Sequence, residues 1–189
     1  MTITRQLYAT RDAVYASLDT KLTTRIKTVI DEAAEAATGS VDGLCHRTFT
    51  PTLRTMTFDY PDSASPTSWR YWLDQDELIS VVTLTSGGVV IPASDYMLRP
   101  DHGPPFTRIE LDRSSASSFG GGATPQRDIT ALGLSGYRND EAAAGTLAEA
   151  LDASETAVDV TDSSADGVGD LVRVDSERML VVEKALLDT

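Results

Sequence analysis

The chain has 189 residues, enough for one full domain and a small appendage, and its 41% hydrophobic and 24% charged residues are typical of globular proteins. It has no run of eighteen apolar residues that could span a bilayer and no apolar stretch of a secretory signal. We therefore expect a protein that is made in the cytoplasm and does not associate with membranes. The net charge of −13 disfavours binding to nucleic-acid phosphates, and a single cysteine excludes an internal disulfide framework.

Two helices are predicted at the start of the chain. Thr10 can cap a short helix over residues 10–19. A longer helix is predicted over residues 23–45, because apolar residues recur there at steps of three or four along one stripe. Gly39 and Gly43 either weaken this helix or let another segment approach it closely. The residues of the stripe are Ile26, Ile30, Ala33, Ala37, Val41 and Leu44.

The apolar period then changes from helical to alternating, which predicts an antiparallel β-domain over residues 52–137. The Gly87-Gly88 pair predicts a hairpin turn between two of its strands. Residues 62–68 and the Gly/Ser-rich stretch 113–125 are predicted to be loops. The predicted strands cover residues 52–60, 69–73, 78–85, 89–91, 96–99, 106–111 and 128–134.

Residues 139–189 differ in composition from the rest of the chain. They contain 13 acidic and 3 basic residues, a net charge of −10, which leaves −3 for residues 1–138. Val158 and Val160 alternate with polar residues, and apolar runs at 171–174 and 179–182 flank a turn sequence, which together predict a small β-module. The chain stops soon after this module, which suggests that its natural end is missing.

These patterns predict an α+β fold: an N-terminal helical pair, then an antiparallel β-domain, then a small C-terminal acidic β-module. We expect residues 1–138 to form the main core. Residues 139–189 have too few apolar residues for a large core of their own, which favours a small separate module. We expect the main core to fold without this module, and the module to gain order from a partner.

No catalytic or metal-binding pattern stands out, so we expect no catalytic residue, no metal and no cofactor. Cys45 and His46 are adjacent in the predicted helix and would point about 100° apart. A buried cysteine and a capping or surface histidine are therefore favoured over a catalytic pair. Five aspartates in the acidic module lack the spacing of a calcium loop, which favours solvated turns over a metal site. They are Asp159, Asp162, Asp166, Asp170 and Asp175.

Two groups of residues are candidates for a subunit or partner interface. In the predicted strand at 69–73, Trp69 and Tyr71 share one face and Trp72 takes the other, which favours packing on both faces over a stacking platform for bases or sugars. Basic residues on or near the helices could pair with carboxylates of an adjoining subunit, although solvation is their simpler role. The candidate interface residues are Arg5, Arg11, Arg25, Lys27, Trp69 and Tyr71.

The segments HRTFTP at 46–51, ISVVTLTSGGVVIPASDYMLRP at 79–100 and GPPFTRIEL at 103–111 follow two helices in this chain. Their sequence and order resemble the head–tail connector adaptors of long-tailed bacteriophages, especially those that infect actinobacteria. The resemblance covers residues from about 5 to 137. It carries over no catalytic residue, because the family's role is structural.

The resemblance implies a virion protein of the phage neck, assembled in the host cytoplasm as a ring, commonly of twelve copies. Such a ring lies between the portal protein and a stopper or tail-completion protein, and the genome passes through its lumen during ejection without specific binding. An excess of carboxylates agrees with this role, because it repels passing DNA over a Debye length of about 8 Å.

Two other functions remain open. A carbohydrate- or receptor-binding virion module of the tail would use the Trp-Tyr cluster, the β-modules and the Gly/Ser loop. A small hydrolase is the least favoured.

Overall fold

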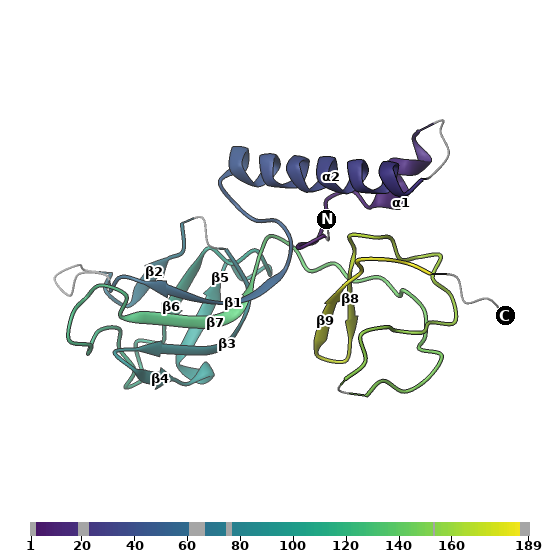
Figure 1. Cartoon of the computed structure of the whole chain (residues 1–189). Helices are drawn as coiled ribbons and strands as arrows, with labels where there is room; N and C mark the ends of the chain where they lie inside the picture. The colour runs from purple at the N-terminus through teal and green to yellow at the C-terminus, as the bar shows by residue number, and fades with distance from the viewer. Residues whose placement is uncertain (1–2, 19–22, 61–66, 75–76, 153, 186–189) are drawn as a thin grey trace. The chain divides into compact units, whose positions relative to one another are not determined.

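The structure is a computed structural model that describes residues 3–18, 23–60, 67–74, 77–152 and 154–185. It has the predicted α+β fold, in which two N-terminal helices precede antiparallel sheets (Figure 1). The end of the first predicted helix at Asp19, most of the predicted loop at 62–68 and the chain end at 186–189 lie outside the described residues. Unit 1, which comprises Met1–Leu44 and Glu141–Thr189, and unit 2, Cys45–Asp140, are the two compact units of the chain.

Unit 2 contains two antiparallel sheets, with strand orders β1-β7-β3-β4 and β2-β6-β5. The first and last strands of the unit are neighbours, with Thr52 opposite Ser135, so the chain enters and leaves unit 2 at adjacent positions. This arrangement suits a domain inserted into another domain. The strands are β1 Thr52–Phe58, β2 Arg70–Trp72, β3 Leu78–Ser86, β4 Val89–Ile91, β5 Tyr96–Arg99, β6 Arg108–Leu111 and β7 Ile129–Ser135, with a 3₁₀ turn, Ala93–Asp95, before β5.

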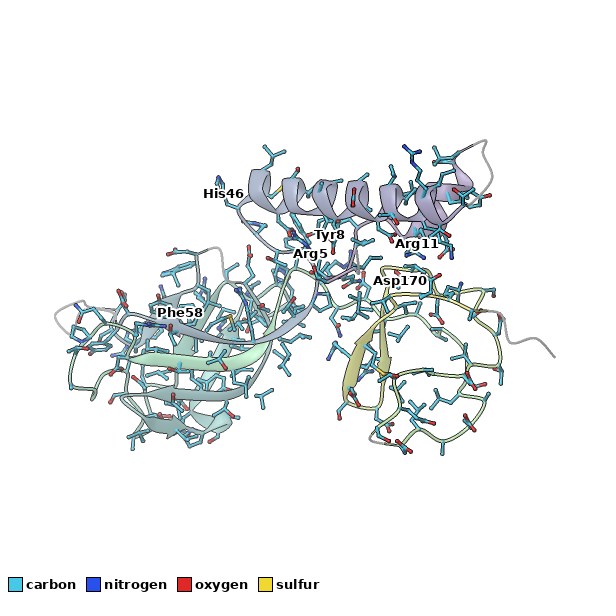
Figure 2. The ribbon with its side chains drawn as sticks, viewed as in Figure 1. Arg5, Tyr8, Arg11, His46, Phe58 and Asp170 are labelled. Carbon is cyan, nitrogen blue, oxygen red and sulfur yellow. The ribbon has the colours of Figure 1, made fainter. Side chains whose placement is uncertain are left out.

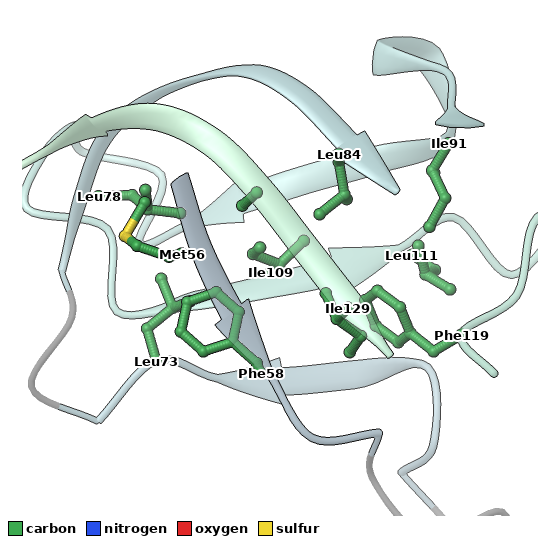
Figure 3. Close-up of a cluster of buried hydrophobic side chains, with 11 residues drawn as sticks. Met56, Phe58, Leu73, Leu78, Leu84, Ile91, Ile109, Leu111, Phe119 and Ile129 are labelled. Carbon is green, nitrogen blue, oxygen red and sulfur yellow. The ribbon is translucent and has the colours of Figure 1, made fainter. Parts of the chain in front are cut away.

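Both sheets of unit 2 contribute to one cluster of eleven buried apolar side chains (Figure 3). Met56 and Phe58 alternate with exposed threonines along β1, as the period of two requires, and Ile109 of the other sheet is fully buried. Each such side chain stabilises the fold by about 1.5–3 kcal/mol relative to an exposed one. The other members of the cluster are Leu73, Leu78, Leu84, Ile91, Leu111, Phe119, Ile129 and Ala131.

The predicted hairpin at Gly87 and Gly88 is confirmed, because β3 and β4 pair with Ser86 opposite Val89. The two glycines have φ values of +58° and +79°, the positive values that a tight two-residue hairpin needs at both central positions. A Cβ atom on Gly87 would lie 2.6 Å from the backbone of Gly121. Glycine is therefore required at position 87 by space as well as by conformation.

Unit 1 contains α1 Arg11–Ala16, α2 Thr24–Cys45, β8 Leu171–Val174 and β9 Glu177–Leu180. Thr10 caps α1 as predicted, since its hydroxyl accepts a hydrogen bond from the Ala13 amide at 3.2 Å. The β8–β9 turn has only two residues, Asp175 and Ser176, with Asp175 at a φ of +52°. The second strand therefore begins at Glu177, two residues earlier than the sequence predicts. Val160 forms only an isolated bridge with Leu147.

Backbone hydrogen bonds join the two distant parts of unit 1. The Leu7 amide donates to the Gly169 carbonyl, and the Arg11 amide donates to the Val168 carbonyl, both at 2.9 Å. Gly169 has a φ of +102°, and a Cβ atom there would lie 2.6 Å from the Leu7 side chain, so this contact requires glycine. The buried apolar residues that accompany these bonds are Ile3, Leu7, Ala34 and Val168.

The division of the chain differs from the one expected from composition. Unit 2 ends at Asp140, close to the expected boundary after residue 138, but Met1–Leu44 belongs with Glu141–Thr189 instead of with the β-domain. The change in composition marks the exit from unit 2. The C-terminal part of the chain associates with the N-terminal segment through hydrogen bonds between residues about 160 positions apart, and no local sequence pattern reveals these bonds.

The buried face of α2 is more polar than its apolar stripe, and the expectation of a buried Cys45 is wrong. The buried residues of α2 are Ile30, Asp31, Ala34 and Thr38, so only Ile30 of the predicted stripe is fully buried. The reason is that the short N-terminal segment bonds to the polar side chains of α2, which turns those positions inward. Cys45 is exposed and not buried, because it ends the helix. His46 follows it at a φ of +51°, in the left-handed conformation common after a helix C-terminus.

Candidate protein interface

Arg11 lies at the start of α1 and is only 5% exposed. Its Nε and one terminal nitrogen donate to the two carboxylate oxygens of Asp31 at 2.7 and 2.6 Å, and its other terminal nitrogen donates to Glu183 at 3.0 Å. The hydrogen bonds from Arg11 to Asp31 raise the arginine pKa further above its ordinary value. Arg11 is therefore engaged inside unit 1 and offers little to a partner.

Lys27 on α2 takes part in the same cluster, since its Nζ donates to Glu183 at 2.7 Å. The hydrogen bond from Lys27, assisted by the one from Arg11, lowers the pKa of Glu183 against the opposing effect of partial burial. Two cations thus share one carboxylate that is 54% exposed. Lys27 also contributes chiefly to unit 1 itself.

Arg5 and Tyr8 of the N-terminal segment are labelled in Figure 2. Both donate to Asp42 near the end of α2, with a distance of 3.2 Å for Arg5. A Cβ atom at Gly39 would lie 3.0 Å from the Arg5 guanidinium, so a side chain, and not another backbone, approaches this glycine. The Arg5 side chain is still 48% exposed, and Arg25 is exposed on α2. These two remain accessible to a partner.

Three large apolar side chains of α2 are exposed, beside polar residues such as Arg25 and Glu32. Val29 is 57% exposed, Val41 40% and Leu44 83%. A shallow cavity of about 270 Å³ adjoins this surface between α2 and the N-terminal segment, with Tyr8, Ile30, Ala33 and Val41 among its lining residues. Exposed apolar residues along one helix face are typical of a protein contact.

The aromatic residues of unit 2 pack on one face of the strand, whereas the sequence predicts packing on both. Trp69 and Tyr71 pack against the sandwich core, with the Tyr71 and Phe58 rings 5.1 Å apart between centroids. Trp72 points the other way and is 51% exposed. Trp69 and Tyr71 therefore act mainly in the core, and Trp72 is the aromatic residue offered to a partner.

Trp72 belongs to a surface that the strand register assembles on the outer side of the β2-β6-β5 sheet. In one cross-strand row, Trp72 pairs with Arg108 and Arg108 with Arg99. In the next row on the same face, Glu110 lies between Arg70 and Met97. We call this surface the Arg/Trp face, and its six residues are Arg70, Trp72, Met97, Arg99, Arg108 and Glu110.

Three guanidinium groups of the Arg/Trp face meet at one buried carboxylate. The Nε atoms of Arg70, Arg108 and Arg99 lie 2.9, 2.8 and 3.2 Å from the oxygens of Glu110, whose side chain is 8% exposed. Burial alone would raise the pKa of Glu110, but hydrogen bonds from Arg108 and Arg99 outweigh burial and lower it. Arg99 also donates to Asp101 and to the Met97 sulfur, whereas the hydrogen bond described for Arg108 uses only its Nε, which leaves the terminal N–H groups of Arg108 for a further acceptor.

The Arg/Trp face also exposes large side chains. The Arg108 guanidinium lies 4.9 Å from the centre of the Trp72 ring, and Met97 is 43% exposed. Trp, Met and Arg are the residue types enriched in the centres of protein interfaces. Within each of the three strands, alternation along the sequence places two residues of the Arg/Trp face on the same side. The register that aligns the three strands depends on pairing between distant segments, which the local sequence pattern does not reveal. The prediction therefore omitted this surface.

The Gly/Ser-rich segment of unit 2 borders a cavity of about 480 Å³, which Asp59, Tyr60 and Gln126 also line. The Gly122 amide donates to Asp128 at 2.8 Å and the Gly120 amide donates to the Ser86 hydroxyl at 2.8 Å. These bonds hold the loop and direct its amides to protein groups, so the loop does not present them to an anionic ligand.

The acidic segment 149–162 of unit 1 contains five carboxylates and no Lys or Arg. Asp152 accepts hydrogen bonds from the amides of Ser154 and Glu155, and Asp162 accepts one from the Ser164 amide at 2.8 Å. Within the described residues, no group of three His, Cys, Asp or Glu side chains is arranged to hold a metal ion. The acidic residues of the segment are Glu149, Asp152, Glu155, Asp159 and Asp162.

None of the helices that the structure describes is both long enough and apolar enough to cross a membrane. No protein-family model matches the chain, and neither the curated proteins nor the solved structures contain a match to it.

Proposed function

We propose that this chain is a structural subunit of a tailed-bacteriophage virion, an adaptor of the head–tail connector. In this role it forms a ring, with twelve copies as the expected number, between the portal protein and a stopper or tail-completion protein. It acts through protein contacts alone, without catalysis or a cofactor. Genomic DNA passes through its lumen without being bound.

The observation that supports this role best is that each unit has a separate surface of interface composition. Unit 1 exposes apolar side chains of α2, including Val29 and Leu44, and unit 2 exposes Trp72 and Met97 of the Arg/Trp face. A subunit of a ring needs at least two different surfaces, because each copy contacts one neighbour on either side through unlike patches. A connector ring also needs surfaces for the proteins above and below it.

The resemblance of residues 5–137 to connector adaptors supports the same role. The segments that carry it form the strands and turns of unit 2: ISVVTLTSGGVVIPASDYMLRP covers most of β3 and all of β4 and β5, and GPPFTRIEL contains β6. The charge agrees as well, since unit 1 has 18 acidic and 8 basic residues, a net of −10, and repels DNA.

One alternative has a specific observation in its favour. The exposed Trp72 and the cavity beside Tyr60 and Gln126 could serve a carbohydrate- or receptor-binding module of the tail. The Arg108 guanidinium over the Trp72 ring occupies the position that a sugar would use for stacking, which favours a protein partner instead.

Immunoelectron microscopy of virions, with antibodies raised against the purified chain, tests the proposal. We expect label at the head–tail junction, and image averaging should show a closed ring there. Label at the tail tip would establish the receptor-binding alternative, and virions without label would refute both. In parallel, the purified chain should not bind a labelled 20-base-pair duplex at moderate salt; a salt-sensitive submicromolar complex would contradict passage of DNA without binding.

A further inference from the structure

The Arg/Trp face is a positively charged surface in an acidic chain. Its three arginines outnumber Glu110, and Asp101 pairs with Arg99 at the edge, which leaves one net positive charge. Unit 2 as a whole has 8 basic and 11 acidic residues. Three of these eight basic residues lie on this one sheet face, together with Trp72, which is 51% exposed. Such a surface suits a partner that is acidic and has apolar contacts to offer.

The chain itself contains a surface of that chemistry. Segment 149–162 has five carboxylates without a basic residue, and Glu149, Asp152, Glu155 and Asp162 are exposed. Hydrogen bonds hold the two ends of the segment together, since the Ala148 amide donates to the Asp159 carbonyl at 2.8 Å and the Thr161 amide donates to Thr146 at 2.9 Å. Groups that are held in place before binding lose less conformational entropy when they bind.

From this complementarity we infer that the Arg/Trp face of one copy docks onto the acidic segment 149–162 of a second copy. The two surfaces belong to different units, so the contact is heterologous, and repetition of a heterologous contact closes into a ring when its rotation allows. The inference rests on the proposed ring and names the surfaces that join neighbouring subunits.

Duplex DNA is a weaker match for the same surface. Phosphate binding needs many uncompensated basic residues, and each arginine of the Arg/Trp face already contacts Glu110. A patch with one net positive charge in a chain of net charge −13 gives DNA little attraction. A protein carboxylate, in contrast, needs only a few of the unused N–H donors and gains from the nearby Trp72 and Met97.

Cysteine cross-linking between two differently tagged chains tests the contact. Both chains carry Cys45→Ser to remove the exposed native thiol; one carries Met97→Cys at the edge of the Arg/Trp face and the other carries Glu149→Cys. We expect a disulfide-linked mixed dimer after mild oxidation at low salt, and much less product in 0.5 M NaCl. The matched control replaces Met97→Cys by Val82→Cys, which is 66% exposed on the other sheet, and should give no product.

Side-chain truncation then identifies the residues responsible. Trp72→Ala or Arg108→Ala in the Met97→Cys chain should reduce the yield of mixed dimer at least about tenfold, as for residues at the centre of an interface. In the Arg108→Ala variant, Glu110 still has its ion pairs with Arg70 and Arg99, so we expect the variant to fold. An unfolding temperature equal to that of the parent chain would confirm that it does. Arg138→Ala, which removes a 69% exposed arginine of the same unit, is the control and should leave the yield unchanged.

Three results would overturn the inference. The first is no mixed dimer, or an equal amount with Val82→Cys. The second is a bond formed only within one chain in the double variant Met97→Cys/Glu149→Cys, which would make the contact intramolecular. The third is DNA binding that Trp72→Ala abolishes. If Arg108→Ala subunits form normal neck rings, the proposed contact between the Arg/Trp face and segment 149–162 is refuted and the adaptor role is intact. If the mixed dimer forms but the chain is absent from the neck of the virion, only the adaptor role is refuted.

Discussion

Unit 2 buries eleven apolar side chains in one cluster, whereas the cluster described in unit 1 has four. Both units contain charged contacts: the buried Arg11–Asp31 pair and the bonds of Glu183 in unit 1, and the three arginines around buried Glu110 in unit 2. The units therefore differ chiefly in the size of the apolar cluster that accompanies these contacts. A unit with few buried apolar side chains depends more on each ion-pair partner being present and ionised.

The comparison also suggests how the chain could serve an assembly. Unit 2 has the core of an independent domain and can act as a rigid body that carries the Arg/Trp face. Unit 1 has a thinner core and leaves Leu44 83% exposed and Val29 57% exposed. Its stability should increase when a neighbour covers these residues, since their burial adds about 25 cal/mol for each Å² removed from water.

Removal of one unit should have the largest effect. We expect residues 45–140 alone to unfold cooperatively, because the whole apolar cluster of unit 2 lies within them. Residues 1–138 should keep the sandwich but lose most of the helical signal, because Leu7 and Arg11 lose their hydrogen-bond acceptors at Gly169 and Val168. Circular dichroism at 222 nm and tryptophan fluorescence measure the two units separately, since both tryptophans, Trp69 and Trp72, lie in unit 2.

Full helical content in the fragment 1–138, with one cooperative transition for both signals, would contradict this expectation. It would support the division predicted from composition, in which the helices belong with the β-domain and residues 139–189 are dispensable.

Arg11→Met should produce the largest effect of any single substitution in unit 1, about 3–5 kcal/mol, because it leaves Asp31, 4% exposed, without its cation. The double variant Arg11→Met/Asp31→Leu should recover most of this loss, since it removes both charges. Lys27→Met is the matched control and should cost at most about 1 kcal/mol, because Lys27 bonds to a carboxylate that is half exposed. Urea unfolding followed at 222 nm measures all three; equal costs for Arg11→Met and Lys27→Met would show that the buried pair is not what holds unit 1.

Ile109→Ala tests the apolar side of the comparison. Ile109 is 0% exposed between the two sheets, so the substitution should lower the free energy of unfolding of unit 2 by about 2–5 kcal/mol and leave unit 1 largely unchanged. Val82→Ala, at a position 66% exposed, should change it by less than about 0.5 kcal/mol. Tryptophan fluorescence during urea unfolding gives the measurement. A parallel loss of helical signal in Ile109→Ala would show that the two units unfold as one.

Local patterns predicted the elements of this fold well. The strands at 89–91 and 96–99 have the predicted bounds, and α2 begins and ends within a residue of its predicted limits, because alternation and helical spacing depend on neighbours in sequence. The buried face of α2 was missed for a physical reason. Asp31 and Thr38 are buried through bonds to Arg11 and Tyr8, and a polar residue that is buried because it has a distant partner looks like a surface residue in the sequence.

The candidate interface also depends on contacts between residues that are distant in the sequence. Residue type alone marks Trp69 and Tyr71 as interface candidates, but the structure places both against the core, while Trp72 on the other strand face is exposed. Arg99 and Arg108 lie nine positions apart in sequence and opposite each other across β5 and β6. Only the register of the sheet brings them together, so a single sequence could not identify the Arg/Trp face.

The smallest expected effect concerns pH. The pKa of Glu183 is lowered in the folded protein, first by the hydrogen bond from Lys27, so its ionised form stabilises unit 1 above the ordinary glutamate pKa of about 4.3, and this contribution is lost as pH falls through the lower folded value. Glu183→Gln should therefore lower the unfolding temperature of unit 1 slightly at pH 7 and have little effect at about pH 3. The change should be small because Glu183 is 54% exposed. Glu149→Gln in the exposed acidic segment is the control and should show no such dependence; an equal loss at both pH values would mean that Glu183 acts through packing and not through its charge.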